Sequence, residues 1–105
     1  MENDQAVLNF LGLAKRANKI VSGENNLLAE IRGGKIHFLF IATDTGASTT
    51  KKFVDKSNYY HVPVNTMYTK EVLSQAIGMQ RTIIGIADAG MAKKIIQLTN
   101  KKKGE

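Results

Sequence analysis

The chain of 105 residues contains no cysteine, and this absence excludes several classes of protein. Disulfide scaffolds, zinc sites built on thiolates and cysteine nucleophiles all require that residue. Long apolar runs are also absent: the longest, residues 38–42, is far too short to span a bilayer. The sequence opens with Glu2 and Asp4, whereas signal and transit peptides open with positive charge. We therefore expect a soluble protein of the cytoplasm without membrane contacts.

Side chains that could perform catalysis are scarce. The two histidines, His37 and His61, have no carboxylate or metal partner that the sequence would predict. No carboxylate pair stands out, and Asp44 and Asp88 each stand between a predicted strand and a predicted helix, where helix capping explains them. Residues 46–51, GASTTK, lack the second glycine of a phosphate-binding Walker loop. We predict a protein that is not an enzyme and needs no metal or other cofactor.

Positive charge is what the sequence has in excess. There are 15 lysines and arginines against 9 aspartates and glutamates, which gives a formal charge of +6 and a pI of about 9.7. Such an excess of positive charge is typical of proteins that bind a polyanion, although excess charge also keeps small proteins soluble. Hydrophobic residues make up 43% of the chain, which is ordinary for a folded protein. Residues 1–105 are therefore predicted to form a single domain.

The hydrophobic pattern alternates between helical and strand periods. This alternation indicates an α/β domain with helices on both faces of a small central sheet. Pro63 indicates either that its strand lies at an edge of the sheet or that the proline stands at the end of the strand. The predicted order is a helix capped by Asn3 or Asp4 and ending near residue 17, a strand at 20–21, a helix around 27–31 stopped by Gly33 and Gly34, a strand at 36–43, a helix at 48–58, a strand at 60–64, a helix from Thr69 to Gly78, a strand at 82–87 and a helix around 91–98.

Residues 15–26, KRANKIVSGENN, combine long cations, a glycine and side-chain amides at a predicted helix start. The cations can reach phosphates, the glycine lets another backbone approach, and the amides can pair with base edges. Free N–H groups at the helix start also favour an anion. A plainer interpretation is equally open, in which Ser22 caps the helix and the other side chains are merely solvated. The residues concerned are Lys15, Arg16, Lys19, Gly23, Asn25 and Asn26.

Several segments together resemble a known family. They are LGLAKRANKIVSGE at 11–24, IATD at 41–44, KKFVDKSNYYHVPV at 51–64, VLSQAIG at 72–78 and DAGMAKKI at 88–95. In this order the chain is similar to the kink-turn RNA-binding ribosomal proteins (the L7Ae and L30e type), particularly their bacterial YlxQ-type branch, over about residues 6–99. The resemblance implies a three-layer α/β/α sandwich with a small mixed sheet of about four strands and five helices. It also implies a structured RNA partner, either ribosomal RNA or another RNA with a kink-turn, which is a bent helix with tandem sheared G·A pairs.

In this family the start of the second helix enters the RNA at the bend. The family's Gly-x-Asn-Glu signature begins at Gly23, and Asn25 also agrees with it, while Glu24 takes the variable position. Asn26 stands where the family commonly has Glu, and the expected basic residue three positions later falls on Ala29. Arg or Lys paired with guanine supplies about 1–3 kcal/mol of discrimination. The resemblance therefore implies RNA binding with a looser preference for the kink-turn.

A second family feature is a loop over a flipped-out nucleotide, which corresponds to residues 77–82 of this chain. Met79 and Arg81 are the expected contacts in it. The implied RNA-binding residues are Lys15, Arg16, Lys19, Gly23, Glu24, Asn25, Asn26, Met79 and Arg81.

Two other functions stay open. A protein-interaction adaptor on the same fold would show an exposed apolar patch, instead of a basic face, beside residues 15–26. An enzyme, or an RNA-recognition domain that has lost a catalytic partner domain, is the third hypothesis, but the chain length leaves no room for a cofactor site. The sequence identifies no protein partner.

Overall fold

A mixed four-stranded sheet forms the middle layer of the computed structural model, which describes residues 2–103. The strands lie in the order β1-β4-β2-β3, with β4 antiparallel to both of its neighbours and β2 parallel to β3. Their bounds are β1 (Ile20–Ser22), β2 (Phe38–Ile41), β3 (Val64–Asn65) and β4 (Ile83–Ile86).

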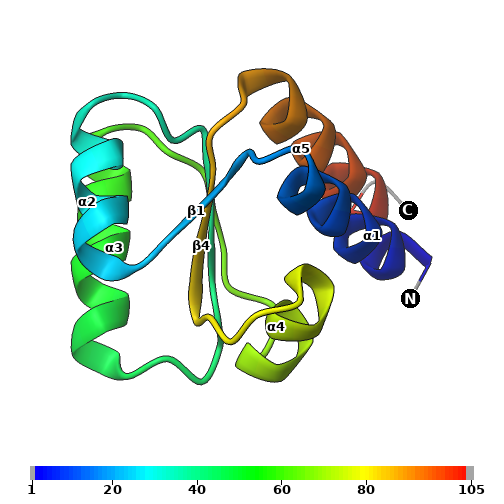
Figure 1. Cartoon of the computed structure of the whole chain (residues 1–105), viewed down its shortest axis with the longest axis horizontal. Helices are drawn as coiled ribbons and strands as arrows, with labels where there is room; N and C mark the ends of the chain where they lie inside the picture. The colour runs from blue at the N-terminus through cyan, green and yellow to red at the C-terminus, as the bar shows by residue number, and fades with distance from the viewer. Residues whose placement is uncertain (1, 104–105) are drawn as a thin grey trace.

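Helices cover both faces of the sheet, which confirms the predicted three-layer sandwich (Figure 1). On one face lie α2 (Glu24–Arg32) and α3 (Ala47–Tyr59); on the other lie α1 (Glu2–Arg16), α4 (Lys70–Ile77) and α5 (Ala89–Lys103). Within residues 2–103, none of these helices combines the length and apolar character that a membrane crossing requires.

The central strands are apolar on both sides because each side packs against helices. In β2, Phe38 and Phe40 belong to the cluster beneath α1, α4 and α5, whereas Leu39 and Ile41 belong to the cluster beneath α2 and α3. Gly85 in β4 has no side chain, and a Cβ built there would lie 2.5 Å from Leu27 Cδ1 of α2. The missing side chain therefore lets α2 lie close to β4.

Two predicted caps are wrong. The helix α1 already begins at Glu2, so Asn3 and Asp4 lie inside it, and Asp4 accepts a hydrogen bond of 3.2 Å from the Tyr68 hydroxyl. The side chain of Asp44 does not cap the helix that follows it, since its Oδ1 accepts from the backbone N of Lys70 at 2.9 Å. Both carboxylates bind partners far away in sequence, which local pattern does not reveal.

The predicted strand at 60–64 is mostly wrong. The helix α3 continues to Tyr59, and the chain then turns through His61, whose φ is 61°, so the strand comprises Val64–Asn65 alone. Pro63 precedes this edge strand, as predicted, and its carbonyl accepts from the Leu39 N–H at 2.9 Å.

Other predicted boundaries are confirmed. Gly33 ends α2, and Thr69 caps α4 by accepting from Val72 N at 3.2 Å. Gly78 ends α4 in the left-handed region, with φ 75°. The Oδ1 of Asp88 accepts from Met91 N at 3.1 Å in the first turn of α5.

Candidate functional site

The start of α2 and the loop between α4 and β4 meet at one end of the sheet. Ser22 pairs with Ile84 in the β1–β4 ladder, so Gly23 follows at the end where the loop enters β4. Between them lies a cavity of about 230 Å³, which we call the α2 cavity. It is lined by Gly23, Glu24, Lys70, Gln80, Arg81, Thr82 and Ile83.

Gly23 gives the helix start an open geometry. Its φ is 90°, a conformation that glycine adopts without steric cost, and no side chain caps α2 within the described residues. The first-turn N–H groups of α2 therefore have no side-chain partner. Such N–H groups at a helix start favour the binding of an anion. The expectation that Ser22 caps this helix is wrong, because its hydroxyl has another partner.

That partner is Arg81, which donates three hydrogen bonds. Its Nε donates to Ser22 Oγ at 2.9 Å, and its Nη1 donates to the Gln80 carbonyl at 2.6 Å. Its backbone N–H donates at 3.1 Å to the hydroxyl of Ser74, a buried residue of α4. Because a guanidinium carries five N–H donors, others are left for a ligand in the α2 cavity.

Two further charged side chains line the α2 cavity. Glu24, the first residue of α2, accepts at Oε1 from Lys52 Nζ of α3 at 3.0 Å. Lys70, the first residue of α4, lines the same cavity as Arg81. Neither Lys52 nor Lys70 was predicted as part of the site, since in the sequence each looks like any exposed lysine of a helix.

The structure places the other expected contacts nearby but outside the α2 cavity. Asn25 and Asn26 are exposed in the first turn of α2. Ala29 is exposed on the same helix. Met79 is half-buried against the core and lines a second hollow, of about 510 Å³, whose lining shares Lys70 and Gln80 with the α2 cavity.

The cations at 15–19 are not brought to the α2 cavity. The Lys19 carbonyl accepts from Ala87 N at 2.8 Å, at the opposite end of β1 from Ser22. Lys15 and Arg16 form the last turn of α1 and are exposed. The structure therefore divides the basic segment from the helix start that follows it.

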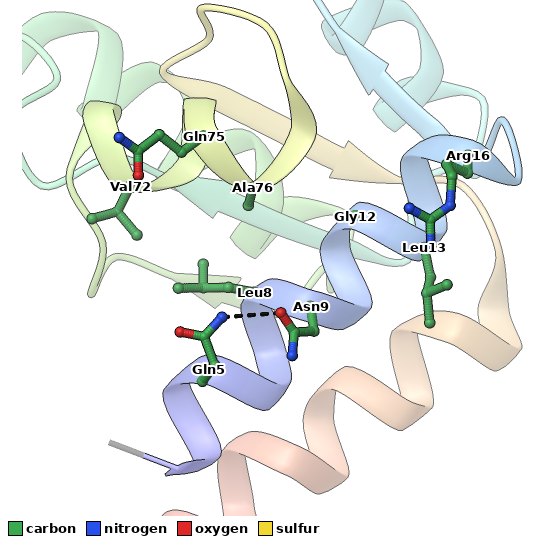
Figure 2. A pocket seen from close by; sticks show the side chains of 9 residues that line it. All are labelled: Gln5, Leu8, Asn9, Gly12, Leu13, Arg16, Val72, Gln75 and Ala76. Carbon is green, nitrogen blue, oxygen red and sulfur yellow. Dashed lines mark hydrogen bonds between the residues drawn. The ribbon is translucent and has the colours of Figure 1, made fainter.

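Arg16 instead lines a separate hollow between α1 and α4, which we call the α1–α4 groove (Figure 2). Its volume is about 750 Å³. One wall carries the Gln5 amide, which donates to Asn9 Oδ1 at 3.0 Å. Of the described lining residues, Arg16 alone is charged. The full lining is Gln5, Leu8, Asn9, Gly12, Leu13, Arg16, Val72, Gln75 and Ala76.

No metal centre is apparent in the part of the chain that the structure describes, where no three His, Asp or Glu side chains are grouped to hold an ion.

The comparison with protein families decides the assignment. The family described as "Ribosomal protein L7Ae/L30e/S12e/Gadd45 family" matches residues 5–96. The chain belongs to this family. Among the L7Ae-type relatives, the RNA-binding protein YlxQ of Enterococcus faecium is 42% identical over 96 residues, covering 91% of this chain and 93% of the relative. The RNA-binding protein YlxQ of Bacillus subtilis (strain 168) is 40% identical over 90 residues, covering 85% and 90%.

Solved structures share the L7Ae-type fold. A protein of unknown function from Bacillus halodurans C superimposes with a TM-score of 0.86 at 34% identity, covering 90% of this chain and 96% of that one. The Giardia lamblia 15.5kD RNA binding protein superimposes with a TM-score of 0.78, covering 99% of this chain and 90% of that one. At 18% identity the second similarity shows the fold alone.

Proposed function

We propose that this chain binds structured RNA at the α2 cavity. The observation that carries the proposal is the convergence of an uncapped helix start, Gly23, with the fixed guanidinium of Arg81. Two relatives that are at least 40% identical are named RNA-binding proteins, which supports it. We further propose that the chain acts in the cytoplasm by binding alone, without catalysis.

Each part of the site has a role in this proposal. Arg81 and Lys70 provide positive charge for phosphates or, in the case of Arg81, for a guanine edge. The α2 N–H groups favour a phosphate oxygen, and Gly23 lets the RNA backbone approach where a side chain would intervene. Asn25 and Asn26 follow Glu24 in α2, and both are exposed. Their amides can therefore pair with base edges.

The proposed ligand is a kink-turn or a closely related bent helix. Gly23 and Asn25 keep the family's signature, but Asn26 and Ala29 lack its carboxylate and its cation. Ala29 is exposed on α2, but its methyl group has no polar atom that could make the missing base contact. We therefore propose a weaker preference for the kink-turn over other structured RNA than a lysine at this position would give.

We also propose phosphate contacts for the cations at the end of β1 that is opposite the α2 cavity. A strand of three residues spans roughly 10 Å, and we propose that a duplex bound at the α2 cavity extends along β1 to Lys15, Arg16 and Lys19. Met79 is proposed to contact RNA only through the second hollow beside Gln80.

An electrophoretic mobility shift tests the proposal. The probes are a kink-turn hairpin and a duplex of equal length without the G·A pairs, at ~150 mM salt, where charge attraction alone is weak. We expect tighter binding of the hairpin. Equal affinity for both probes would contradict kink-turn recognition, and no shift of either would contradict RNA binding.

The source of the RNA needs a separate experiment. Because the family is named for ribosomal proteins, we propose ribosomal RNA as the source. Crosslinking in cells followed by sequencing of the bound RNA should then recover ribosomal RNA at a kink-turn. Recovery of other structured RNA in its place would contradict the ribosomal association.

The adaptor hypothesis gains no support from the surface beside residues 15–26. Among the described side chains near residues 15–26, the large apolar residue that is exposed is Leu13, whose exposed fraction is 45%. A single exposed leucine is ordinary on a soluble protein. The adaptor function therefore stays a prediction that only the sequence-based resemblance supports.

A further inference from the structure

The family resemblance counts Glu24 among the RNA-binding residues, but its carboxylate is a negative charge at a cavity proposed to hold phosphates. Glu24 lines the cavity together with Arg81 and Lys70. A carboxylate that turned toward these cations would pair with them and would also repel an incoming phosphate. An RNA site at this position therefore requires that the carboxylate be held elsewhere.

Lys52 provides that restraint from a different helix. Its Nζ lies 3.0 Å from Glu24 Oε1, although the two residues are 28 positions apart. Lys52 is not among the residues that line the α2 cavity, so the ion pair draws the carboxylate toward α3. The helices α2 and α3 lie side by side on one face of the sheet (Figure 1). The ion pair places Lys52 of α3 at the start of α2.

The pair is too exposed to be explained by fold stability. The side chains of Lys52 and Glu24 are 46% and 49% exposed, and exposed ion pairs contribute little to folding. Lys51, the preceding residue, makes an ordinary pair on the surface of its own helix, with Asp55 Oδ2 at 2.9 Å. The Lys52 pair differs because it joins two helices beside a cavity lined with cations.

We propose that Lys52 is a positioning residue for RNA binding. By holding the Glu24 carboxylate on the α3 side, it leaves Arg81 and Lys70 unpaired toward the RNA. In its absence Glu24 competes with the RNA for the same cations. This inference rests on the proposed function, because it describes how the α2 cavity keeps its positive charge.

Three variants measured with the kink-turn hairpin test the proposal. Lys52→Ala should weaken binding about fivefold, since it releases a carboxylate beside the phosphates. Glu24→Gln in the Lys52→Ala protein should restore affinity to within about twofold of the wild type. The matched control is Lys51→Ala, which removes a neighbouring cation and should change affinity less than about twofold.

The salt dependence separates positioning from direct contact. If Lys52 touched a phosphate, Lys52→Ala would lower the slope of log affinity against log salt by about one, and Glu24→Gln would not restore binding. That pair of results would overturn the proposal, as would a Lys52→Ala protein that binds like the wild type. Failure of the wild type to bind the hairpin would instead overturn the proposed function and this inference with it. All variants should melt within a few degrees of the wild type, which shows that they fold.

Discussion

The α2 cavity and the α1–α4 groove both border α4, but they differ in size and in chemistry. The groove is about 750 Å³ and the α2 cavity about 230 Å³. The larger hollow is lined by amides and aliphatic side chains, with Arg16 at one end, whereas the smaller combines Arg81, Lys70 and a helix start. Recognition of RNA depends on cations and N–H donors, which the smaller hollow concentrates. The chemistry of the lining, and not the volume, is therefore the reason that we propose the α2 cavity as the RNA site.

The largest expected effect comes from Gly85→Val, which should disturb the α2 cavity and spare the groove. A Cβ at this position would lie 2.5 Å from Leu27 Cδ1 and 3.1 Å from Ile36 Cδ1, and Leu27 is fully buried. Overpacking of a core costs about 1–3 kcal/mol, so we expect the melting temperature to fall by roughly 10–20 °C. Circular dichroism during heating measures it.

Gly46→Ala is the control for that substitution. Gly46 has φ −56° and open space around an added Cβ, so the melting temperature should change by only a few degrees. A second variant, Gly85→Val with Leu27→Ala, should recover part of the loss because it makes room for the valine. If Gly85→Val melts like the wild type, α2 is not held in place by its close approach to β4.

The next effect compares two arginines, one for each hollow. Arg81→Ala removes the guanidinium of the α2 cavity and should weaken hairpin binding about tenfold, which corresponds to one strong base or phosphate contact. Arg16→Ala removes the guanidinium of the groove and should weaken binding less than about threefold, as expected for a screened, more distant charge. Mobility shifts at a fixed salt concentration measure both. Equal losses would mean that the two hollows contribute alike to RNA binding.

Tyr68→Phe should affect stability without affecting RNA binding. Its hydroxyl donates to Asp4 of α1 at 3.2 Å, and the loss of such a bond costs about 1 kcal/mol of unfolding free energy. Because Tyr68 belongs to the core cluster under α1, α4 and α5, the α2 cavity should bind the hairpin as before. Urea unfolding and the mobility shift measure the two properties. A parallel loss of RNA affinity would show that the two sides are coupled.

The same tyrosine predicts a pH dependence. Burial, followed by the nearby charge of Asp4 and its hydrogen bond, raises the pKa of Tyr68 from 10.0 to about 12. The folded protein therefore holds this proton more tightly than the unfolded chain, and the resulting stabilisation is complete below pH 10. It is lost as the pH rises from 10 to about 12. Unfolding free energy should fall more steeply over this range in the wild type than in Tyr68→Phe, and identical curves would contradict the assignment.

Local sequence patterns were sufficient for most of the fold. The apolar runs of β2 and β4 and the glycines that end α2 and α4 carry their signal within a few residues. The strand predicted at 60–64 failed because Tyr60 and His61 continue into a turn after α3, which their strand-like composition hides. Tertiary contacts decide such cases, and composition does not contain them.

The candidate site was less accessible to sequence analysis. The bonds that build it join residues far apart in the chain, such as Arg81 to Ser22 and Lys52 to Glu24. Gly23 was predicted from the residue types at 15–26, and Arg81 was predicted only through the family resemblance. The position of Arg16 could have been found, because Gln5, Asn9, Gly12 and Arg16 recur at helical spacing and so share one stripe of α1.

The smallest expected effect concerns Leu13, the most exposed leucine beside the groove. Leu13→Gln exchanges a side chain that is 45% exposed, so the unfolding free energy should change by less than about 0.5 kcal/mol. Hairpin affinity should stay within about twofold of the wild type, because amides and aliphatic groups away from the cations add little to phosphate binding. If Leu13→Gln lowered hairpin affinity as much as Arg81→Ala, the RNA would lie along the groove. That result would contradict the proposed difference between the two hollows. A hairpin affinity within twofold of the wild type would indicate that Leu13 does not contact the RNA.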